Sequence, residues 1–260
     1  MAKVYLVQMN IVSRDKKQNF ASVRRLLSQT SLERGSLIVL PEMFGTGFET
    51  DNLDGLSESF ATPDSGETAV FLQSLADETG CLIQGGGIDS QGSPFRNFVG
   101  VYVPHATKLL ANFYKLHPFA SEKKNFAGGT SVVLYPFKQL TISPFICYDL
   151  RFPEEFRKAA SLGAEVFTVV ASWPAKRALH WKVLLQARAI ENQCYVLGVN
   201  RVGEDAEEAY EGGSIAIGPS GEIIAEAGTQ ECVLVIDLEI KTVLSVRKAF
   251  PVLADIRKAL

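Results

Sequence analysis

Residues 145–153 read Phe-Ile-Cys-Tyr-Asp-Leu-Arg-Phe-Pro, and they place a single thiol where an apolar run gives way to a polar turn. Cys147 ends the run that begins at Leu140, and Pro153 with two glutamates then predicts a helix start. A thiol at a strand end can face the N–H groups of the following helix, which stabilise a thiolate or a developing oxyanion. The alternative is a structural cysteine, because free cysteine is among the most buried residue types.

The composition is that of a soluble globular protein. The chain has 260 residues, of which 47% are hydrophobic and 21% are charged, so it can build a large core. No apolar run approaches the roughly 20 residues of a membrane-spanning helix. The N-terminal residues pass directly into a strand pattern, without the apolar region and cleavage site of a signal peptide. We therefore expect a cytoplasmic protein that does not span a membrane.

Charge and cysteine usage argue against a nucleic-acid-binding protein and against a fold held by zinc or disulfides. The formal net charge is −3 and no long basic run occurs, so nucleic-acid binding is not predicted. The four cysteines are far apart and form no CxxC pair, which predicts free thiols rather than a zinc site or a disulfide framework.

Strand-like and helical patterns alternate along the chain. Helical spacing occurs around residues 20–27 and 71–75, and a longer helix is expected at about 177–193. No long Pro/Gly/Ser linker divides the chain, so we expect an α/β fold with one domain over residues 1–260. The predicted strands cover residues 4–7, 37–40, 81–84, 98–103, 132–134, 140–146, 166–171, 195–199, 214–217 and 232–237.

Two charged residues also end apolar runs and are candidate partners for Cys147. Glu42 follows the run 37–40, where a carboxylate can serve as a general base, and Lys115 follows the run 109–114, where an ammonium can stabilise an oxyanion. Glu122, seven residues later, could orient that lysine. Taken singly, each is more commonly an exposed surface residue.

A cysteine–histidine pair is the other way to activate the thiol. The sequence contains only three histidines, and none lies in a local pattern specific for such a pair. They are His105, His117 and His180.

Three motifs occur in an order typical of one family. They are Leu-Pro-Glu-Met-Phe at 40–44, Tyr-Lys-Leu-His-Pro-Phe at 114–119 and Ile-Cys-Tyr-Asp-Leu-Arg-Phe-Pro-Glu at 146–154. In this order they resemble the Glu, Lys and Cys signatures of the nitrilase superfamily of carbon–nitrogen hydrolases. The resemblance continues through Ala-Ser-Trp-Pro at 171–174, Ala-Arg-Ala-Ile-Glu-Asn at 187–192 and Gly-Gly-Ser at 212–214.

The resemblance implies a four-layer α-β-β-α sandwich with the catalytic residues gathered at strand ends. It implies Cys147 as the nucleophile, Glu42 as the general base, Lys115 as the catalytic lysine and Glu122 as the second glutamate. Lys115 and the backbone N–H of Tyr148 would hold the oxyanion. Neither a metal nor an organic cofactor is expected.

The motifs look most like those of the omega-amidase branch, which releases ammonia from omega-amides of dicarboxylic acids such as 2-oxoglutaramate and 2-oxosuccinamate. Such a substrate carries a carboxylate, and Arg151 is the candidate cation for it. A structural salt bridge is the alternative role of Arg151. Trp173 is a candidate pocket wall or a core residue, and Asn200 a substrate ligand or a brace for loops.

Other functions stay open at this point. Within the superfamily these are nitrile hydrolysis, N-carbamoyl-amine hydrolysis and a deaminated-glutathione-type amidase; outside it, a non-catalytic ligand-binding protein on the same fold. The resemblance also implies a homodimer or higher homo-oligomer. Residues 240–260 form a C-terminal tail with apolar and basic residues, which we expect to pack at that interface.

Overall fold

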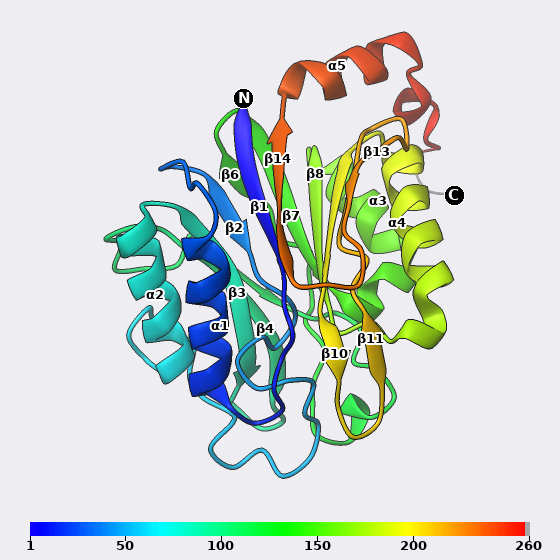
Figure 1. Ribbon diagram of the computed structural model, residues 1–260. Helices are drawn as coiled ribbons and strands as arrows, with labels where there is room; N and C mark the ends of the chain where they lie inside the picture. Colours follow the sequence, from blue (N-terminus) through cyan, green and yellow to red (C-terminus); the bar gives the residue numbers. More distant parts are fainter. Residues whose placement is uncertain (258–260) are drawn as a thin grey trace.

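The computed structural model describes residues 1–257, and its two six-stranded sheets pack face to face between layers of helices (Figure 1). The predicted α/β fold, a four-layer α-β-β-α sandwich, is confirmed. The first sheet has the order β14 (Cys232–Leu238), β1 (Ala2–Gln8), β2 (Leu37–Val39), β3 (Leu82–Asp89), β4 (Arg96–Tyr102) and β5 (Ala111–Tyr114). The second has the order β13 (Ile223–Glu226), β12 (Ile215–Ile217), β9 (Tyr195–Asn200), β8 (Val166–Ala171), β7 (Leu140–Ile146) and β6 (Tyr135–Phe137).

Two helices cover the outer face of each sheet. Helices α1 and α2 lie on the first sheet, and α3 and α4 lie on the second (Figure 1). None of the helices within residues 1–257 has the length and apolar character needed to cross a membrane. The helices are α1 (Lys16–Ser28), α2 (Glu67–Thr79), α3 (Pro153–Ser161), α4 (Ala178–Asn192) and α5 (Ile240–Ala249).

The side-chain alternation of β1 shows how one strand supports two layers. Tyr5 and Val7 pack with the helices α1 and α2, whereas Val4 and Leu6 belong to the core between the two sheets. Because successive side chains of a strand point to opposite faces, a strand that is apolar at every position is buried on both.

The strand directions bring several strand ends to one edge. β1, β2 and β3 run parallel in the first sheet, and β7, β8 and β9 run parallel in the second. β5 is antiparallel to β4, which is antiparallel to β3, so β5 also ends at the edge where β2 ends. Ligands of α/β folds bind outside the carboxyl ends of strands.

One predicted strand is wrong. Residues 132–134 lie outside the sheet, and β6 begins instead at Tyr135, which pairs with Ile142. In this register residue 133 would lie opposite Pro144, which has no N–H for the ladder, and the carbonyl of Val133 instead accepts from the hydroxyl of Ser143 at 2.8 Å. Val132 is buried in the core without joining the ladder, so its apolar character reflects packing rather than a strand.

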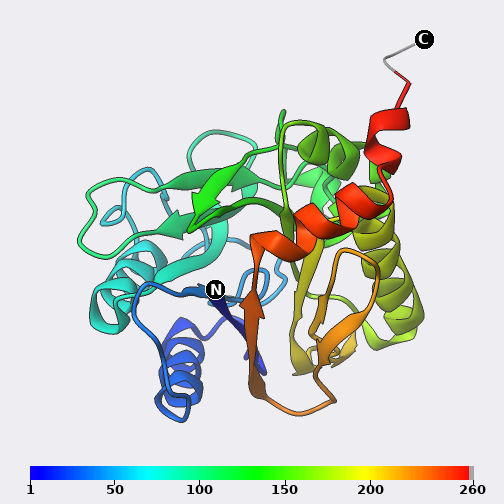
Figure 2. The same cartoon turned by 90° about the horizontal axis from the view of Figure 1, so that it is seen from above.

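The C-terminal segment folds back on its own chain. α5 and the short 3₁₀ helix η4 (Val252–Asp255) cross one end of the sandwich (Figure 2). The guanidinium of Arg247 donates to the carbonyl oxygens of Ala164 at 2.9 Å and Gln193 at 3.3 Å. The single domain and the oligomer interface at residues 240–260 stay predictions, and residues 258–260 lie outside the described residues.

Arg247 should anchor this segment. We expect Arg247→Met to lower the free energy of unfolding in urea by about 1.5–3 kcal/mol, because hydrogen bonds from a charged donor are lost. Lys248→Met, at an exposed neighbouring position, should change it by no more than about 0.5 kcal/mol. Equal effects of the two substitutions would show that apolar packing alone holds α5.

Candidate active site

Cys147 lies directly after β7, as the sequence predicted, and begins the 3₁₀ helix η2 (Cys147–Arg151). Its φ is +45°, a conformation that costs a non-glycine residue on the order of 1–3 kcal/mol and persists only where the surroundings enforce it. This turn directs the chain away from the strand, and Cys147 and Tyr148 both line a pocket. The N–H of Tyr148 belongs to the first turn of η2, whose amides have no partner within the helix.

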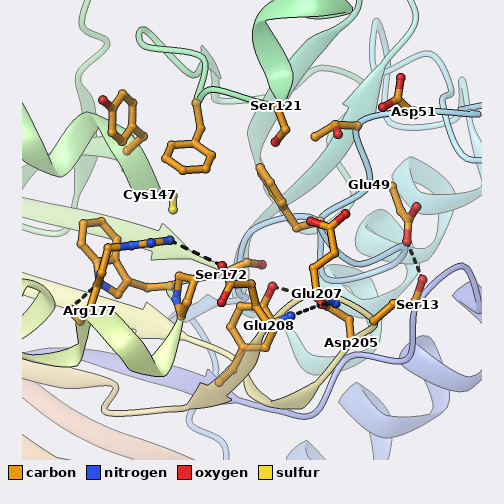
Figure 3. A pocket seen from close by; sticks show the side chains of 18 of the residues that line it. Ser13, Glu49, Asp51, Ser121, Cys147, Ser172, Arg177, Asp205, Glu207 and Glu208 are labelled. Atoms are coloured by element: carbon orange, nitrogen blue, oxygen red, sulfur yellow. Dashed lines mark hydrogen bonds and ion pairs between the residues drawn. The ribbon is translucent and has the colours of Figure 1, made fainter.

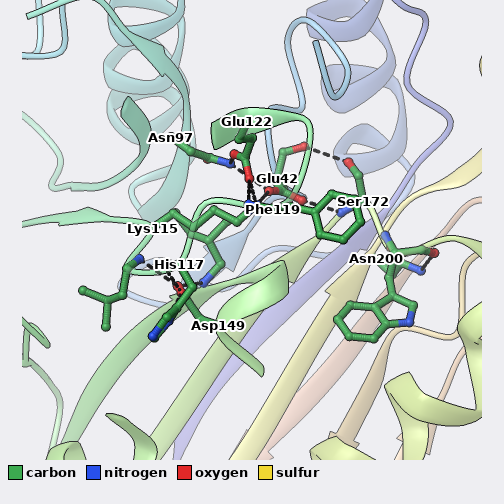
Figure 4. A network of polar contacts seen from close by, with 12 residues as sticks. Glu42, Asn97, Lys115, His117, Phe119, Glu122, Asp149, Ser172 and Asn200 are labelled. Carbon is green, nitrogen blue, oxygen red and sulfur yellow. Dashed lines mark hydrogen bonds and ion pairs between the residues drawn. The ribbon is translucent and has the colours of Figure 1, made fainter. Parts of the chain in front are cut away.

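The three predicted partners of the thiol meet in one buried cluster (Figure 4). Lys115 Nζ lies 2.9 Å from Glu42 Oε1 and 2.7 Å from Glu122 Oε2. Glu42 follows β2, Lys115 follows β5, and Glu122 begins the 3₁₀ helix η1 (Glu122–Lys124). All three side chains are at most 1% exposed. They are therefore internal groups rather than the surface residues that each could have been.

Lys115 is held as an ammonium by this arrangement. Burial alone would lower its pKa, but the carboxylates of Glu122 and Glu42 outweigh burial, so its pKa is raised. An ammonium has three N–H donors, and the two carboxylates take two of them. One donor is left for another group beside the cluster.

The thiol of Cys147 is held in its neutral form. Its pKa is raised well above the usual value, first by burial and then by the negative charge of Glu42, while Lys115 acts in the opposite direction. A thiol with a raised pKa carries almost no thiolate at neutral pH. Any nucleophilic attack by Cys147 therefore requires a base that removes its proton, and Glu42 is the carboxylate with the strongest effect on it.

Two groups that the sequence analysis did not assign also donate hydrogen bonds to the carboxylates of Glu42 and Glu122. Asn97 on β4 donates through Nδ2 to Glu42 Oε1 at 2.8 Å and to Glu122 Oε1 at 2.9 Å. The backbone N–H of Ser172, after β8, donates to Glu42 Oε2 at 2.8 Å. Ser172 lies in a quoted motif, but nothing local marks its amide as a carboxylate ligand. Asn97 gave no signal, because the predicted strand began at residue 98 whereas β4 begins at Arg96.

Asp149 was also missed, and it joins the segment of Cys147 to that of Lys115. Its buried carboxylate accepts from the backbone N–H groups of His117 at 2.8 Å, Ile146 at 3.2 Å and Leu116 at 3.3 Å (Figure 4). A carboxylate with several N–H donors is a strong local tie. Asp149 therefore fixes the position of η2 relative to the end of β5.

The histidines have partners other than the thiol. The ring of His117 lies 3.0 Å from Asp149, and that of His105 lies 3.5 Å from Asp77. His180 Nδ1 lies 3.4 Å from the guanidinium of Arg151. The cysteine–histidine alternative gains no support from these contacts. Within residues 1–257, no three His, Cys, Asp or Glu side chains are arranged to hold a metal ion.

Comparison with known proteins identifies the family. The sequence pattern described as "Carbon-nitrogen hydrolase" matches residues 3–248. The chain belongs to the carbon–nitrogen hydrolase family. It is thus an enzyme that hydrolyses carbon–nitrogen bonds, and the resemblance to the nitrilase superfamily is confirmed.

Individual relatives of this hydrolase have names that are more specific than the family description. It is 34% identical to "Omega-amidase YafV" of Escherichia coli, over 97% of this chain and 96% of that one. It is 32% identical to "2-oxoglutaramate amidase" of Bacillus subtilis, over 88% and 87%. The crystal structure of XC1258 from Xanthomonas campestris, described as a CN-hydrolase superfamily protein with an arsenic adduct in the active site, superposes with a TM-score of 0.91 at 29% identity, over 100% and 98%. These names support an amidase.

The pocket of the hydrolase has a volume of about 280 Å³ and opens over Cys147 (Figure 3). Arg151 and Trp173 also line it, and the guanidinium carbon of Arg151 lies 4.8 Å from the centre of the Trp173 ring. Asn200 holds Trp173 in place, since it accepts from the Trp173 N–H at 2.7 Å and donates to the Trp173 carbonyl at 3.0 Å. Asn200 is therefore a brace for the pocket wall.

Arg151 and the acidic side chains that line the pocket differ in whether they have a partner of opposite charge. Among residues 1–257, no carboxylate lies within 4.0 Å of the Arg151 guanidinium, so it forms no structural salt bridge. Three acidic side chains of the pocket have cationic partners. Glu49 pairs with Arg14, Asp51 with Lys124, and Glu208 with Lys176. The guanidinium of Arg151 therefore contacts His180 and Trp173 but is paired with no carboxylate among the described residues.

The pKa of Cys147 gives a prediction about Glu42. Glu42→Gln removes a negative charge that raises the pKa of the thiol while Lys115 keeps its positive charge, so the pKa of Cys147 should fall. Thiolate absorbance near 240 nm should then appear at lower pH than in the wild type. Cys147→Ala supplies the background of the other three cysteines. A titration curve that Glu42→Gln leaves unmoved would contradict this electrostatic coupling.

Proposed function

We propose that this hydrolase is an omega-amidase that cleaves the terminal amide of small dicarboxylic acid omega-amides, such as 2-oxoglutaramate and 2-oxosuccinamate, and releases ammonia. Two relatives support this assignment, since one is named an omega-amidase and the other a 2-oxoglutaramate amidase. The observation that carries it is a single small pocket lined both by Cys147 and by the unpaired guanidinium of Arg151. The first would attack the amide while the second binds the carboxylate at the other end of the molecule.

The first half of the reaction forms a thioester. Glu42 accepts the Sγ proton of Cys147 as the sulfur attacks the amide carbon, and the C=O bond opens to an oxyanion. The third N–H of Lys115 and the backbone N–H of Tyr148 donate to that oxyanion. One such donor typically contributes about 2.7–4 kcal/mol to stabilisation of the transition state. Glu42 then returns the proton to the leaving nitrogen, and the C–N bond breaks to release ammonia.

The second half regenerates the thiol. Glu42 removes a proton from a water molecule, whose oxygen attacks the thioester carbon, and Lys115 with Tyr148 again stabilises the oxyanion. The C–S bond breaks, the sulfur takes the proton from Glu42, and the dicarboxylic acid leaves. Glu122 contacts no reacting atom in this scheme; it holds Lys115 through an ion pair of 2.7 Å.

The pairing of charges supports 2-oxo acids over 2-amino acids as substrates. A 2-oxo amide presents one carboxylate, which the free Arg151 can bind. A 2-amino amide also presents an ammonium, which would need an unpaired carboxylate. Glu49, Asp51, Asp205 and Glu208 already pair with cations of this chain, and Glu207, which also lines the pocket, is exposed to solvent.

Ammonia release from a panel of omega-amides, nitriles and N-carbamoyl compounds tests the assignment. We expect 2-oxoglutaramate and its short analogues to be the best substrates, and Cys147→Ala to lower kcat at least about 10³-fold, because the nucleophile is lost. Cys232→Ala, on β14, is the matched control and should keep wild-type turnover. A nitrile or N-carbamoyl compound that outperforms the omega-amides would exclude this substrate class, and turnover by Cys147→Ala would exclude the mechanism.

Comparing amide substrates that carry a carboxylate with neutral amides tests the role of Arg151. Arg151→Met should raise KM for carboxylate-bearing amides by roughly 10- to 100-fold, the effect of losing a hydrogen-bonded ion pair, and should change KM for neutral amides little. Arg14→Met removes another arginine of the same pocket, but one that already pairs with Glu49, and should discriminate less. Equal losses on charged and neutral amides would show that Arg151 is not the carboxylate anchor.

A further inference from the structure

Asn97 holds a central place in the cluster although no catalytic step uses it. It lies near the start of β4 and is 2% exposed. Its backbone carbonyl accepts from the N–H of Lys115 at 2.9 Å, so the two residues lie side by side at the edge of the sheet. Its side-chain nitrogen donates to Glu42 Oε1 at 2.8 Å and to Glu122 Oε1 at 2.9 Å. One amide thus connects both carboxylates that flank Lys115 (Figure 4).

The orientation of this amide follows from its partners. If the side chain of Asn97 were turned over, its carbonyl oxygen would face two carboxylate oxygens, and all three are acceptors. In the observed orientation both N–H groups point at carboxylates, and Oδ1 is buried without a hydrogen-bond partner among the described residues. Leaving a buried acceptor unpaired is unfavourable. The side chain of Asn97 is therefore oriented so that its N–H groups donate to Glu42 and Glu122, although this leaves Oδ1 unpaired.

The net negative charge of the cluster explains why the two N–H donors of Asn97 stabilise it. Lys115 supplies one positive charge for two buried carboxylates, so one negative charge is left over. Cys147 beside β7 and Tyr210 on β11 also interact electrostatically with Glu42, and neither supplies a positive charge. Buried carboxylates stay ionised only when hydrogen bonds or cations compensate for lost hydration.

We propose that Asn97 is a positioning residue that keeps Glu42 and Glu122 both ionised on either side of Lys115, so that Glu42 can accept the proton of Cys147 at neutral pH. This inference rests on the proposed role of Glu42 as general base. It assigns to Asn97 no contact with the substrate. Its effect appears instead in the pH range over which the enzyme works.

The pH profile of kcat/KM for ammonia release tests this role. Asn97→Leu keeps a similar size but removes both donors, which favours the protonated carboxylates. The acid limb of the profile should therefore move to higher pH by about one unit or more. At the pH optimum the variant should lose much less activity than at pH 6. Asn112→Leu, at an exposed position on the adjacent strand β5, is the matched control and should leave the profile unchanged.

A second variant covers the case in which Asn97→Leu fails to fold. Asn97→Asp keeps the shape of the side chain but sets a third carboxyl group against two carboxylates, so its acid limb should move upward at least as far. Circular dichroism shows whether each variant is folded. A folded variant that loses the same factor of activity at every pH, or keeps the wild-type acid limb, would overturn the proposal.

The experiments distinguish a failure of the proposed role of Asn97 from a failure of the proposed function. If Cys147→Ala retains turnover, the thioester mechanism is wrong and the pH profile no longer reports on Glu42. If Cys147→Ala is inactive while folded Asn97 variants keep the wild-type acid limb, the mechanism stands and only the role of Asn97 is wrong.

Discussion

The ammonium of Lys115 between the carboxylates of Glu42 and Glu122 is the interaction on which the rest of the site depends. Each of the three groups is almost fully buried, and an isolated charge in that environment would be strongly unfavourable. The three residues come from the ends of β2 and β5 and from η1. Only a fold that brings these ends to one edge can pair them, so the sandwich and the site are mutually dependent.

Burial, and after it the negative charge of Glu42, keeps the thiol of the nucleophile protonated. Glu42 raises the pKa of Cys147, and the same carboxylate is positioned to take its proton. A neutral thiol is less open to oxidation than a thiolate, because oxidation follows thiolate character. In the proposed mechanism, Glu42 removes the proton of the thiol as the sulfur attacks the amide, and Lys115, already paired with the two carboxylates, donates its remaining N–H to the oxyanion.

Sequence patterns found the parts of the site that end apolar runs and missed those joined by distant contacts. Cys147, Glu42 and Lys115 each follow a strand, and three ordered motifs distinguished them from ordinary surface residues. Asn97 is 55 residues from Glu42, and the amide of Ser172 is 130 residues from it, so no local pattern reveals either contact. Residues 132–134 show the converse error, in which an apolar run is buried without being a strand.

The short helix η2 links chemistry to substrate choice in the proposed function. Cys147 begins this helix and Arg151 ends it, and a 3₁₀ helix rises about 2.0 Å per residue, so their backbones lie on the order of 8 Å apart along its axis. Asp149, between them, is tied by hydrogen bonds to the segment that follows Lys115. In the proposed function, the spacing between the attacked amide and the bound carboxylate would therefore depend on this helix together with the side chain of Arg151. Substrates would be selected by the length of the chain between those two groups, before any side chain of the pocket moves.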